Sequence, residues 1–280
     1  MRLLPIPTLN RATVYADCVA GVTAAELSTR LIAASQNVET AAGQYAVHAA
    51  NKQLHMLTSC GWGEGTQIIL PNITKSEFVA LYDDQMSNAN GGGRSHYDKL
   101  RLTKLGICPF CGFGHVSTLD HFAAKSRYPA FSVLPINLVP SCSDCNKGKG
   151  ASLITVETDM PHPYFEDSCI EIDKWLTCEV VESLPVTVSY TAQFPLTWGE
   201  SLSTRMKNYF TELKLASRYA VQAASYMAGA KEFLADMSEV DLQWYINKKL
   251  NSYTHPNGWE AALYAGLARS QWFMEFGYKG

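Results

Sequence analysis

Four cysteines in the middle of the chain have the spacing of metal ligands. They form two pairs with two residues between the thiols of each pair: Cys108 with Cys111, and Cys142 with Cys145. This spacing lets both thiolates of a pair turn towards one tetrahedral ion, and two pairs complete a closed zinc site. Gly112 and Gly114 suit the tight backbone that such a turn requires. We expect a structural zinc ion, because four thiolates leave no open position for water; buried free thiols or a redox pair are the alternatives.

The other cysteines show no ligand spacing and are expected to be small buried hydrophobic residues. They are Cys18, Cys60, Cys169 and Cys178. Cys169 and Cys178 lie in segments whose alternating pattern predicts strands.

The thirty residues between the cysteine pairs, and those just after them, contain groups suited to phosphodiester hydrolysis. This reaction needs a base that deprotonates water, a hard cation on the phosphate and the leaving oxygen, and positive charge near the phosphate. His121 is a candidate base, and the side-chain oxygens of Asp120 and Asn146 are ligands that Mg²⁺ prefers. Four basic residues are candidates for contacts with phosphates: Lys125, Arg127, Lys147 and Lys149.

Each of these residues has an ordinary structural interpretation when it is taken alone. Asp120 and His121 would be surface or capping residues, Asn137 a turn residue and Asn146 a helix cap. Their joint placement between and beside two cysteine pairs favours the catalytic interpretation.

Residues 108–150 resemble the zinc-knuckle subclass of the HNH nucleases, whose core is a ββα-metal fold. The matching positions are residues 119–122, Lys125 and Ser126, Tyr128 and Pro129, residues 137–140, the second cysteine pair with Asn146, and Lys149. Ala123 and Ala124 stand where many relatives carry proline, a difference that affects loop stiffness and not chemistry.

The resemblance implies a role for each motif residue. Asp120 ends the first strand as a metal ligand, and His121 is the general base. Asn137 pins the loop between the strands and orients the base. Asn146 replaces the third, name-giving histidine as a metal ligand, a variation that occurs in active members. The implied catalytic ion is a single Mg²⁺ or Mn²⁺.

His162 lies in a short downstream segment, residues 162–165, that also resembles this subgroup. Two interpretations stay open for it. It belongs to a turn that closes the ββα unit with buried aromatic residues, which we favour, or it contacts a phosphate.

The elements around the motif predict an α+β protein, mainly helical, built around a central ββα-metal motif that a four-cysteine zinc site stabilises. At 280 residues and 47% hydrophobic, the chain can bury a sizeable core. We expect an N-terminal helical region over 1–95, a nuclease core over 96–167, and a strand pair with helices packed on the core over 168–280.

Periodicity and breakers place the individual elements. Helices are expected within residues 11–58, with a second one over 41–57, and later over 202–237 and 259–276. Capping boxes at Thr23/Glu26 and Thr74/Glu77 predict two helix starts, and residues 88–93 predict a break. Strands are expected over 169–181 and 186–194.

Charge is distributed unevenly along the chain. The net charge is −3, yet residues 94–150 hold eight lysines and arginines against three aspartates. A basic centre within acidic flanks predicts a local anion site that a partner helps to complete. No apolar stretch reaches the length needed to cross a bilayer and no signal peptide is evident, so we expect a cytoplasmic protein that does not contact membranes.

The sequence therefore predicts a metal-dependent endonuclease that cleaves DNA. Its layout is similar to the HNH effectors of bacterial anti-phage systems, such as the nuclease subunit of Septu-type systems, which implies an ATPase partner subunit. Two alternatives stay open: an HNH nuclease acting on RNA, and a zinc-stabilised module that binds nucleic acid or protein without cleaving. Retention of Asp120, His121, Asn137 and Asn146 argues against binding alone.

Overall fold

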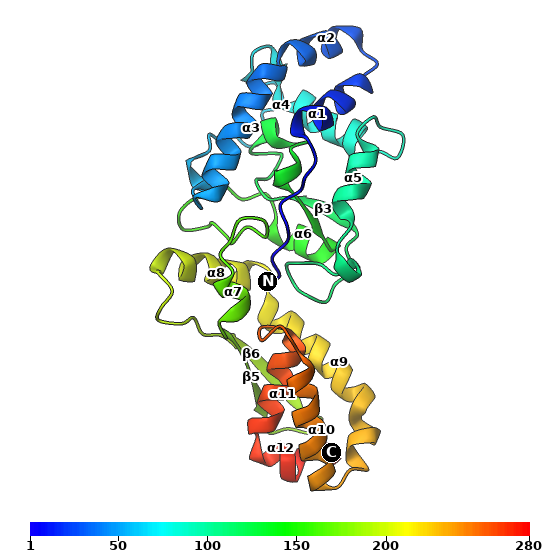
Figure 1. Cartoon of the computed structure of the whole chain (residues 1–280), viewed down its shortest axis with the longest axis vertical. Coiled ribbons are helices and arrows are strands. Elements are labelled where there is room, and N and C mark those ends of the chain that lie inside the picture. Colours follow the sequence, from blue (N-terminus) through cyan, green and yellow to red (C-terminus); the bar gives the residue numbers. More distant parts are fainter. The chain divides into compact units, whose positions relative to one another are not determined.

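The computed structural model describes residues 1–280 except for the side chain of Lys104 (Figure 1). Helices account for 52% of the chain and short strand pairs for the rest of its regular structure, so the expected mixture of helix and strand is confirmed. Contacts divide the chain into two compact units, Arg2–Glu166 and Asp167–Gly280, the latter with Met1. The finer division at residues 95 and 167 stays a prediction.

The first unit begins with helices and ends with the motif region. Its elements are α1 (Arg11–Ala20), α2 (Ala25–Ala33), α3 (Ser35–Ala50), β1 (Ile68–Leu70), β2 (Ile73–Thr74), α4 (Lys75–Ala80), a π-helix (Leu81–Met86), α5 (Arg94–Arg101), β3 (Thr118–His121), β4 (Leu138–Ser141) and α6 (Ser143–Lys149). β1 pairs with β2, and β3 pairs with β4, both antiparallel.

Capping residues explain some of the helix starts. The Thr74 side chain accepts from the Glu77 backbone while the Glu77 carboxylate accepts from the Thr74 backbone, so this predicted capping box is confirmed. The capping box predicted at Thr23 is wrong. The N-cap of α2 lies one residue later, at Ala24, which makes no side-chain hydrogen bond to the helix. Glu26 instead forms an ion pair with Arg30.

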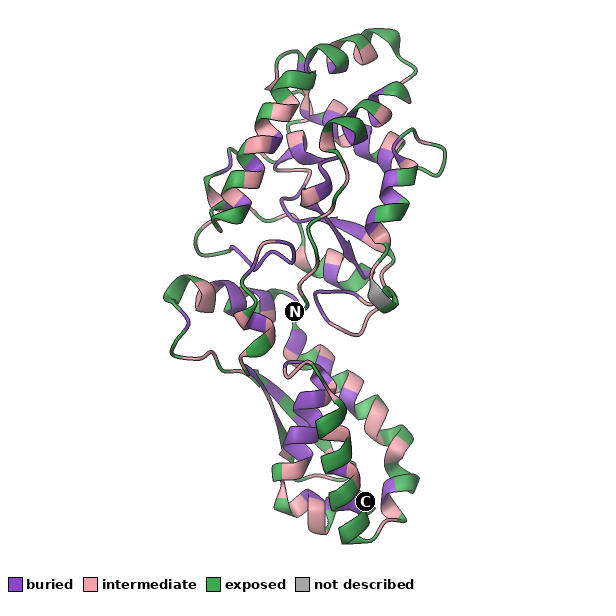
Figure 2. Cartoon of the chain, viewed as in Figure 1, coloured by how far each residue is buried: buried purple, intermediate pink, exposed green. Residues whose placement is uncertain are grey.

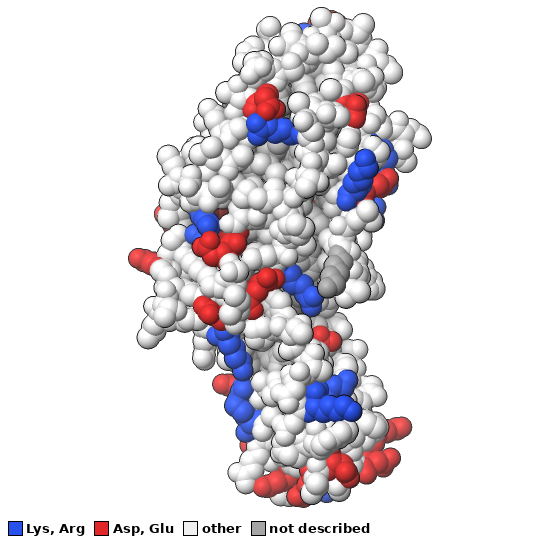
Figure 3. Space-filling view, in the orientation of Figure 1, with Lys and Arg blue, Asp and Glu red and all other residues white. Residues whose placement is uncertain are grey.

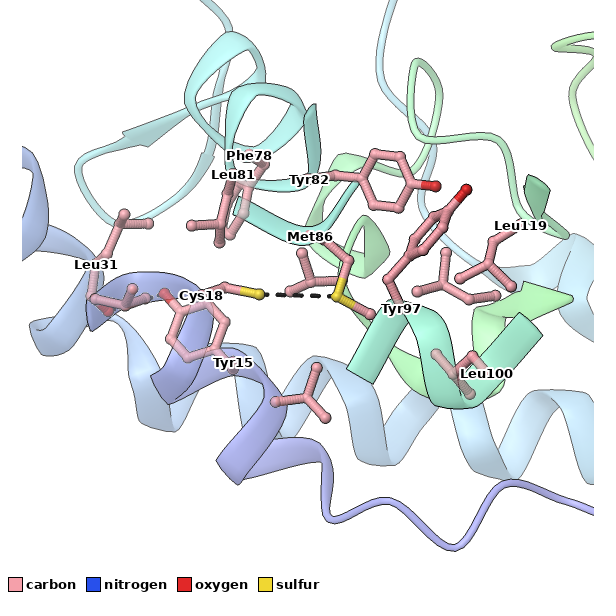
Figure 4. Packing of buried hydrophobic residues seen from close by; sticks show 14 of the residues in the cluster. Tyr15, Cys18, Leu31, Phe78, Leu81, Tyr82, Met86, Tyr97, Leu100 and Leu119 are labelled. Carbon is pink, nitrogen blue, oxygen red and sulfur yellow. Dashed lines mark hydrogen bonds between the residues drawn. The ribbon is translucent and has the colours of Figure 1, made fainter. Parts of the chain in front are cut away.

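One hydrophobic cluster joins the N-terminal helices to the motif strands. It contains side chains from α1 to α5 together with Leu119 of β3 and Leu138 of β4 (Figure 4). In Figure 4, Cys18 and Met86 face each other across this cluster, with their sulfur atoms 3.9 Å apart. β3 and β4 are therefore buried strands supported by the helices, as their purple colour in Figure 2 shows.

The second unit pairs one hairpin with a set of helices. Its elements are α7 (Cys169–Ile172), β5 (Leu176–Val181), β6 (Thr187–Ala192), α8 (Glu200–Glu212), α9 (Leu215–Ala235), α10 (Glu239–Ser252), α11 (Trp259–Arg269) and α12 (Gln271–Glu275). β5 and β6 are antiparallel, α11 packs against β5, and α9 packs against β6. Asn257 fixes the start of the hairpin, because its Oδ1 accepts from the backbone N–H groups of Trp175 and Leu176.

Three expectations for this unit need correction. The predicted strand over 169–181 is wrong at its start, where α7 turns the chain so that Ile170 and Trp175 are both buried. The helix over 202–237 is two helices, since Lys214 takes a left-handed conformation between α8 and α9. The helix over 259–276 is likewise broken at Ser270, and α10 was not predicted.

No helix among the described residues is long and apolar enough to cross a bilayer.

Gly92 offers a test of the close packing between α1 and the loop before α5. A Cβ at residue 92 would lie 2.2 Å from the backbone oxygen of Asp17, whereas one at Gly229 of α9 would meet nothing within 4 Å. We expect Gly92→Ala to lower the free energy of unfolding by about 1–3 kcal/mol. Gly229→Ala, the matched control, should raise it by about 0.5–1 kcal/mol because alanine favours the helix.

Denaturant unfolding of the full chain measures both variants. A Gly92→Ala protein as stable as wild type would contradict the packing described for this loop.

Candidate metal centre and active site

The four cysteines of the two pairs come together in the first unit. Their sulfur atoms all lie within 4.8 Å of one another, all four residues are buried, and none forms a disulfide. Cys111 Sγ and Cys142 Sγ are 3.8 Å apart. A tetrahedral zinc site with Zn–S bonds of about 2.3 Å has sulfur atoms about 3.8 Å apart, so the cluster fits this ion. The expected four-cysteine site is confirmed as an arrangement that could bind a metal ion such as zinc.

The backbone around the first pair explains this proximity. Gly112 has a φ of +76°, a conformation that L side chains rarely adopt. A Cβ at Gly114 would lie 2.9 Å from Cys142 Sγ, so only glycine lets the turn approach the second pair this closely. The Gly114 N–H donates to Cys111 Sγ at 3.3 Å.

The two motif strands place Asp120 and His121 at the end of a hairpin. Asp120 lies opposite Val139, and His121 lies opposite Leu138, in the antiparallel register of β3 and β4. α6 follows directly after β4 and packs against β3. The hairpin and α6 therefore bring the predicted site residues onto adjoining elements.

His121 has a defined tautomer. Its Nε2 lies 2.8 Å from the carbonyl oxygen of Ser132, which can only accept, so Nε2 carries the hydrogen. The lone pair is then on Nδ1, which forms no hydrogen bond to the described residues. The ring is 8% exposed, and burial lowers its pKa to about 3, with smaller contributions from the positive charges of Lys125 and Lys149. His121 is thus a neutral acceptor at neutral pH.

Asp120 is a buried carboxylate beside one ammonium group. It is 3% exposed, and its Oδ2 lies 3.1 Å from Lys149 Nζ in an ion pair. Burial raises the pKa of Asp120, and the charge of Lys149 opposes this shift. A carboxylate is the type of ligand that a hard cation such as Mg²⁺ prefers.

Asn137 is fully buried and uses both ends of its amide. Its Oδ1 accepts from the backbone N–H of Ala123 at 2.7 Å and from the hydroxyl of Tyr45 at 2.9 Å. Its Nδ2 donates to the backbone oxygens of Ala123 and Phe131. The amide therefore connects the two ends of the loop over residues 122–131.

The remaining predicted site residues are more exposed, and most are already engaged. Asn146 is half-buried on α6, and Lys147 is exposed there. Lys149 donates to the backbone oxygen of His121 at 2.7 Å in addition to its contact with Asp120. Lys125 forms an ion pair with Asp83. Arg127 donates to the Cys60 backbone and lies over the ring of Trp62.

The predicted basic centre is therefore partly neutralised by acidic residues close to it. On the face shown in Figure 3, charged side chains lie in small scattered groups, and uncharged residues cover most of the surface. That the four basic residues of the site contact phosphates stays a prediction.

Two residues beside the site were not predicted from the sequence, and both come from the π-helix. The Tyr82 ring meets the His121 ring edge-on at 4.3 Å between centroids, and Lys125 Nζ lies 4.8 Å above the same Tyr82 ring. Asp83 binds Lys125. A π-helix is rare and often occurs at functional sites, but the helical pattern of this segment carried no signal of it.

His162 lies in an aromatic cluster and not on the surface. Its ring is 4.0 Å from that of Phe122 and 5.0 Å from that of Phe165, and it is 5% exposed. Burial lowers its pKa to about 3, helped by the charge of Lys149 and opposed by a bond to the Ile136 backbone. The position agrees with the closing turn that we favoured.

The other four cysteines have mostly apolar surroundings. Cys18, Cys60 and Cys178 are buried, and Cys169 is half-buried at the start of α7. Burial raises the pKa of Cys18 to about 12, as expected for an unreactive core thiol.

Comparison with known proteins gives a similarity that spans the chain. No protein-family model matches the sequence, and no solved structure matches the fold. Protein ea31 of Escherichia phage lambda is 27% identical over 297 aligned residues, which cover 98% of this chain and 99% of that protein. The similarity therefore extends over both units.

Metal analysis tests the cysteine cluster. We expect the purified protein to contain about one zinc ion, and Cys145→Ser to lose it together with much of its thermal stability, because removal of one ligand opens the closed site. Elemental analysis and thermal unfolding measure these effects. Cys169→Ser, outside the cluster, is the control and should keep the metal; equal zinc in both variants would contradict the assignment.

The buried histidines predict a loss of stability in acid. Between pH 6.5 and 3 the unfolded chain holds a proton on His162 that the folded chain lacks, so stability is complete above pH 6.5 and falls as the pH decreases. At about 1.4 kcal/mol per pH unit, His162→Gln should reduce the loss between pH 7 and 4.5 by about 2–3 kcal/mol relative to wild type.

Chemical denaturation at the two pH values measures this difference. Release of metal in acid affects both proteins alike, so it cancels in the comparison. An identical pH dependence of the two proteins would show that the pKa of His162 does not differ between the folded and the unfolded chain, and would contradict the prediction.

Proposed function

We propose that this protein is a metal-dependent HNH endonuclease that hydrolyses phosphodiester bonds of DNA. The observation that carries the proposal is the arrangement at the end of β3. There the Nε2–H of His121 is committed to the Ser132 carbonyl, while the carboxylate of the adjacent Asp120 is buried and paired with Lys149. A base with a free lone pair beside a cation ligand is what hydrolysis of a phosphodiester requires.

The hairpin followed by α6 supports the same proposal. β3, β4 and α6 have the order of a ββα-metal motif, and the cysteine cluster lies at its edge, with one pair before β3 and the other at the start of α6. Asn137 holds the intervening loop, the role that the resemblance assigns to it.

The side chains divide the reaction among them. His121 Nδ1 accepts a proton from water as the water attacks phosphorus in line with the departing 3′ oxygen, which leaves a 5′-phosphate end. Ser132 fixes the orientation of the imidazole through the Nε2 hydrogen bond. Asp120 and Asn146 would hold the divalent ion. When bound, Mg²⁺ or Mn²⁺ supplies Lewis-acid stabilisation of the charge on the phosphate and the departing oxygen.

The low pKa of His121 has a consequence for this chemistry. Burial keeps the ring neutral and able to accept a proton at neutral pH, but a group with a pKa of about 3 is a weak base. The negative charge of a bound phosphate would raise the pKa of His121. The proposal therefore requires that substrate binding makes His121 a stronger base.

The same proposal includes a biological setting. We infer that the nuclease is an effector of bacterial anti-phage defence and acts with an ATPase partner subunit. The support is the layout of the chain, a motif within helical flanks, and the pairing of Lys125 with Asp83, which leaves less free positive charge for DNA. Such a site gains from a partner that delivers the nucleic acid.

Cleavage assays test the proposal. We expect supercoiled plasmid to be cut in the presence of Mg²⁺ or Mn²⁺, and His121→Ala to lower the rate by at least about 100-fold because the base is lost. His115→Ala, at an exposed position in the same unit, is the control and should cleave like wild type. RNA is tested in parallel as the alternative substrate.

Two outcomes would overturn the nuclease proposal. The first is equal cleavage by wild type and His121→Ala. The second is that folded, zinc-loaded protein cleaves neither DNA nor RNA, even when the proposed ATPase partner subunit is added. This result favours the binding module.

A further inference from the structure

A chain of buried hydrogen bonds runs from the segment after α6 to the amide of Asn137. The backbone N–H of Tyr164 donates to His162 Nδ1 at 3.2 Å, so the ring hydrogen is on Nε2. His162 Nε2 lies 3.3 Å from the hydroxyl oxygen of Tyr45. The Tyr45 hydroxyl donates to Asn137 Oδ1 at 2.9 Å, since an amide oxygen can only accept. The direction of each bond is thereby defined.

Tyr45 brings the N-terminal helices into this chain. It lies in α3 and is fully buried, and its ring packs edge-on against Phe131 at 5.1 Å between centroids. Its hydroxyl reaches a residue 92 positions later in the sequence. α3 also contacts the short helical turn Pro129–Phe131, so the tyrosine sits behind the loop that Asn137 holds.

The chain ends at groups that set the position of His121. Asn137 Nδ2 donates to the Phe131 carbonyl. The carbonyl of the following residue in the sequence, Ser132, accepts from His121 Nε2. Asn137 Oδ1 accepts from Ala123, two residues after His121. A displaced amide at residue 137 would therefore move both the carbonyl that orients His121 and the backbone that follows it.

We propose that Tyr45 and His162 are positioning residues for the base of the active site, an inference that rests on the proposed function. His162 orients the Tyr45 hydroxyl, and Tyr45 holds the Asn137 amide against the loop. Neither residue touches the reacting atoms. Both residues act through Asn137 and Ser132 to fix the position of the His121 side chain.

The buried setting explains why one hydroxyl matters. An unpaired polar group in the interior costs more than the average hydrogen bond contributes. Loss of the hydroxyl leaves Asn137 Oδ1 with the Ala123 N–H alone, and leaves His162 with its bond to the Ile136 backbone. The amide can then rotate or shift to recover a partner. Shifts of about 1 Å in a catalytic group reduce rates by about 100-fold.

The test compares two buried tyrosines whose hydroxyls donate to different acceptors. Tyr45→Phe removes the bond to Asn137. Tyr15→Phe removes another buried hydroxyl, which donates to the Leu31 carbonyl at 2.9 Å and not to Asn137, and is the matched control. Two readouts are used: kcat and KM for DNA cleavage, and the exchange rate of the Ala123 amide hydrogen by NMR.

For Tyr45→Phe we expect kcat to fall about 10- to 100-fold with little change in KM, and the Ala123 amide to exchange at least about tenfold faster. Tyr15→Phe should leave both at wild-type values. Tyr45→Phe combined with His162→Gln should be no worse than the more impaired single variant, because both act through one chain.

The two readouts separate this inference from the nuclease proposal. If wild type does not cleave nucleic acid, the nuclease proposal fails, and faster exchange of Ala123 in Tyr45→Phe alone still supports the positioning chain. Equal exchange and equal kcat in the two phenylalanine variants would overturn the inference, as would additive losses in the double variant.

Discussion

The side chain of Asn137 is the contact on which the candidate site depends. Its amide accepts two hydrogen bonds and donates two. Three of these bonds join it to Ala123 and Phe131 of the loop over 122–131, and the fourth joins it to Tyr45 of α3. A buried amide with all of its donors and acceptors paired admits one orientation. The loop over 122–131 is thereby fixed at both ends, and with it the carbonyl that defines the tautomer of His121.

Buried charge shapes the rest of the site. Asp120 and Lys149 share an interior in which either one alone would be costly, and Lys149 also ties α6 to the backbone of His121. The two histidines of this region stay neutral because burial disfavours their charged forms. The surroundings of Asp120 thus include its ion pair with Lys149 and two neutral imidazole rings, and a divalent cation or a phosphate group would change this balance directly.

Local spacing accounts for the features that the sequence predicted well. The interval between cysteines, the glycines after Cys111 and the capping box at Thr74 each depend on neighbours a few residues away. Features that depend on distant contacts were missed or misplaced. Tyr45 meets Asn137 across 92 residues, and the π-helix carrying Tyr82 has an ordinary helical pattern. The strand expected at Cys169 became a helix because a tertiary demand, burial of Ile170 and Trp175, outweighed a short alternating pattern.

The support that Ser132 receives from α4 limits how far the motif can be treated as a module. Its hydroxyl donates to the Phe78 carbonyl at 2.7 Å, and its own carbonyl orients the candidate base. A segment limited to residues 108–150 would keep the motif residues and the cysteine cluster, yet lose this anchor. Transplantation of the site into another scaffold therefore has to carry the helices before residue 95 with it. In design terms, the compact unit that contains all of these contacts is Arg2–Glu166.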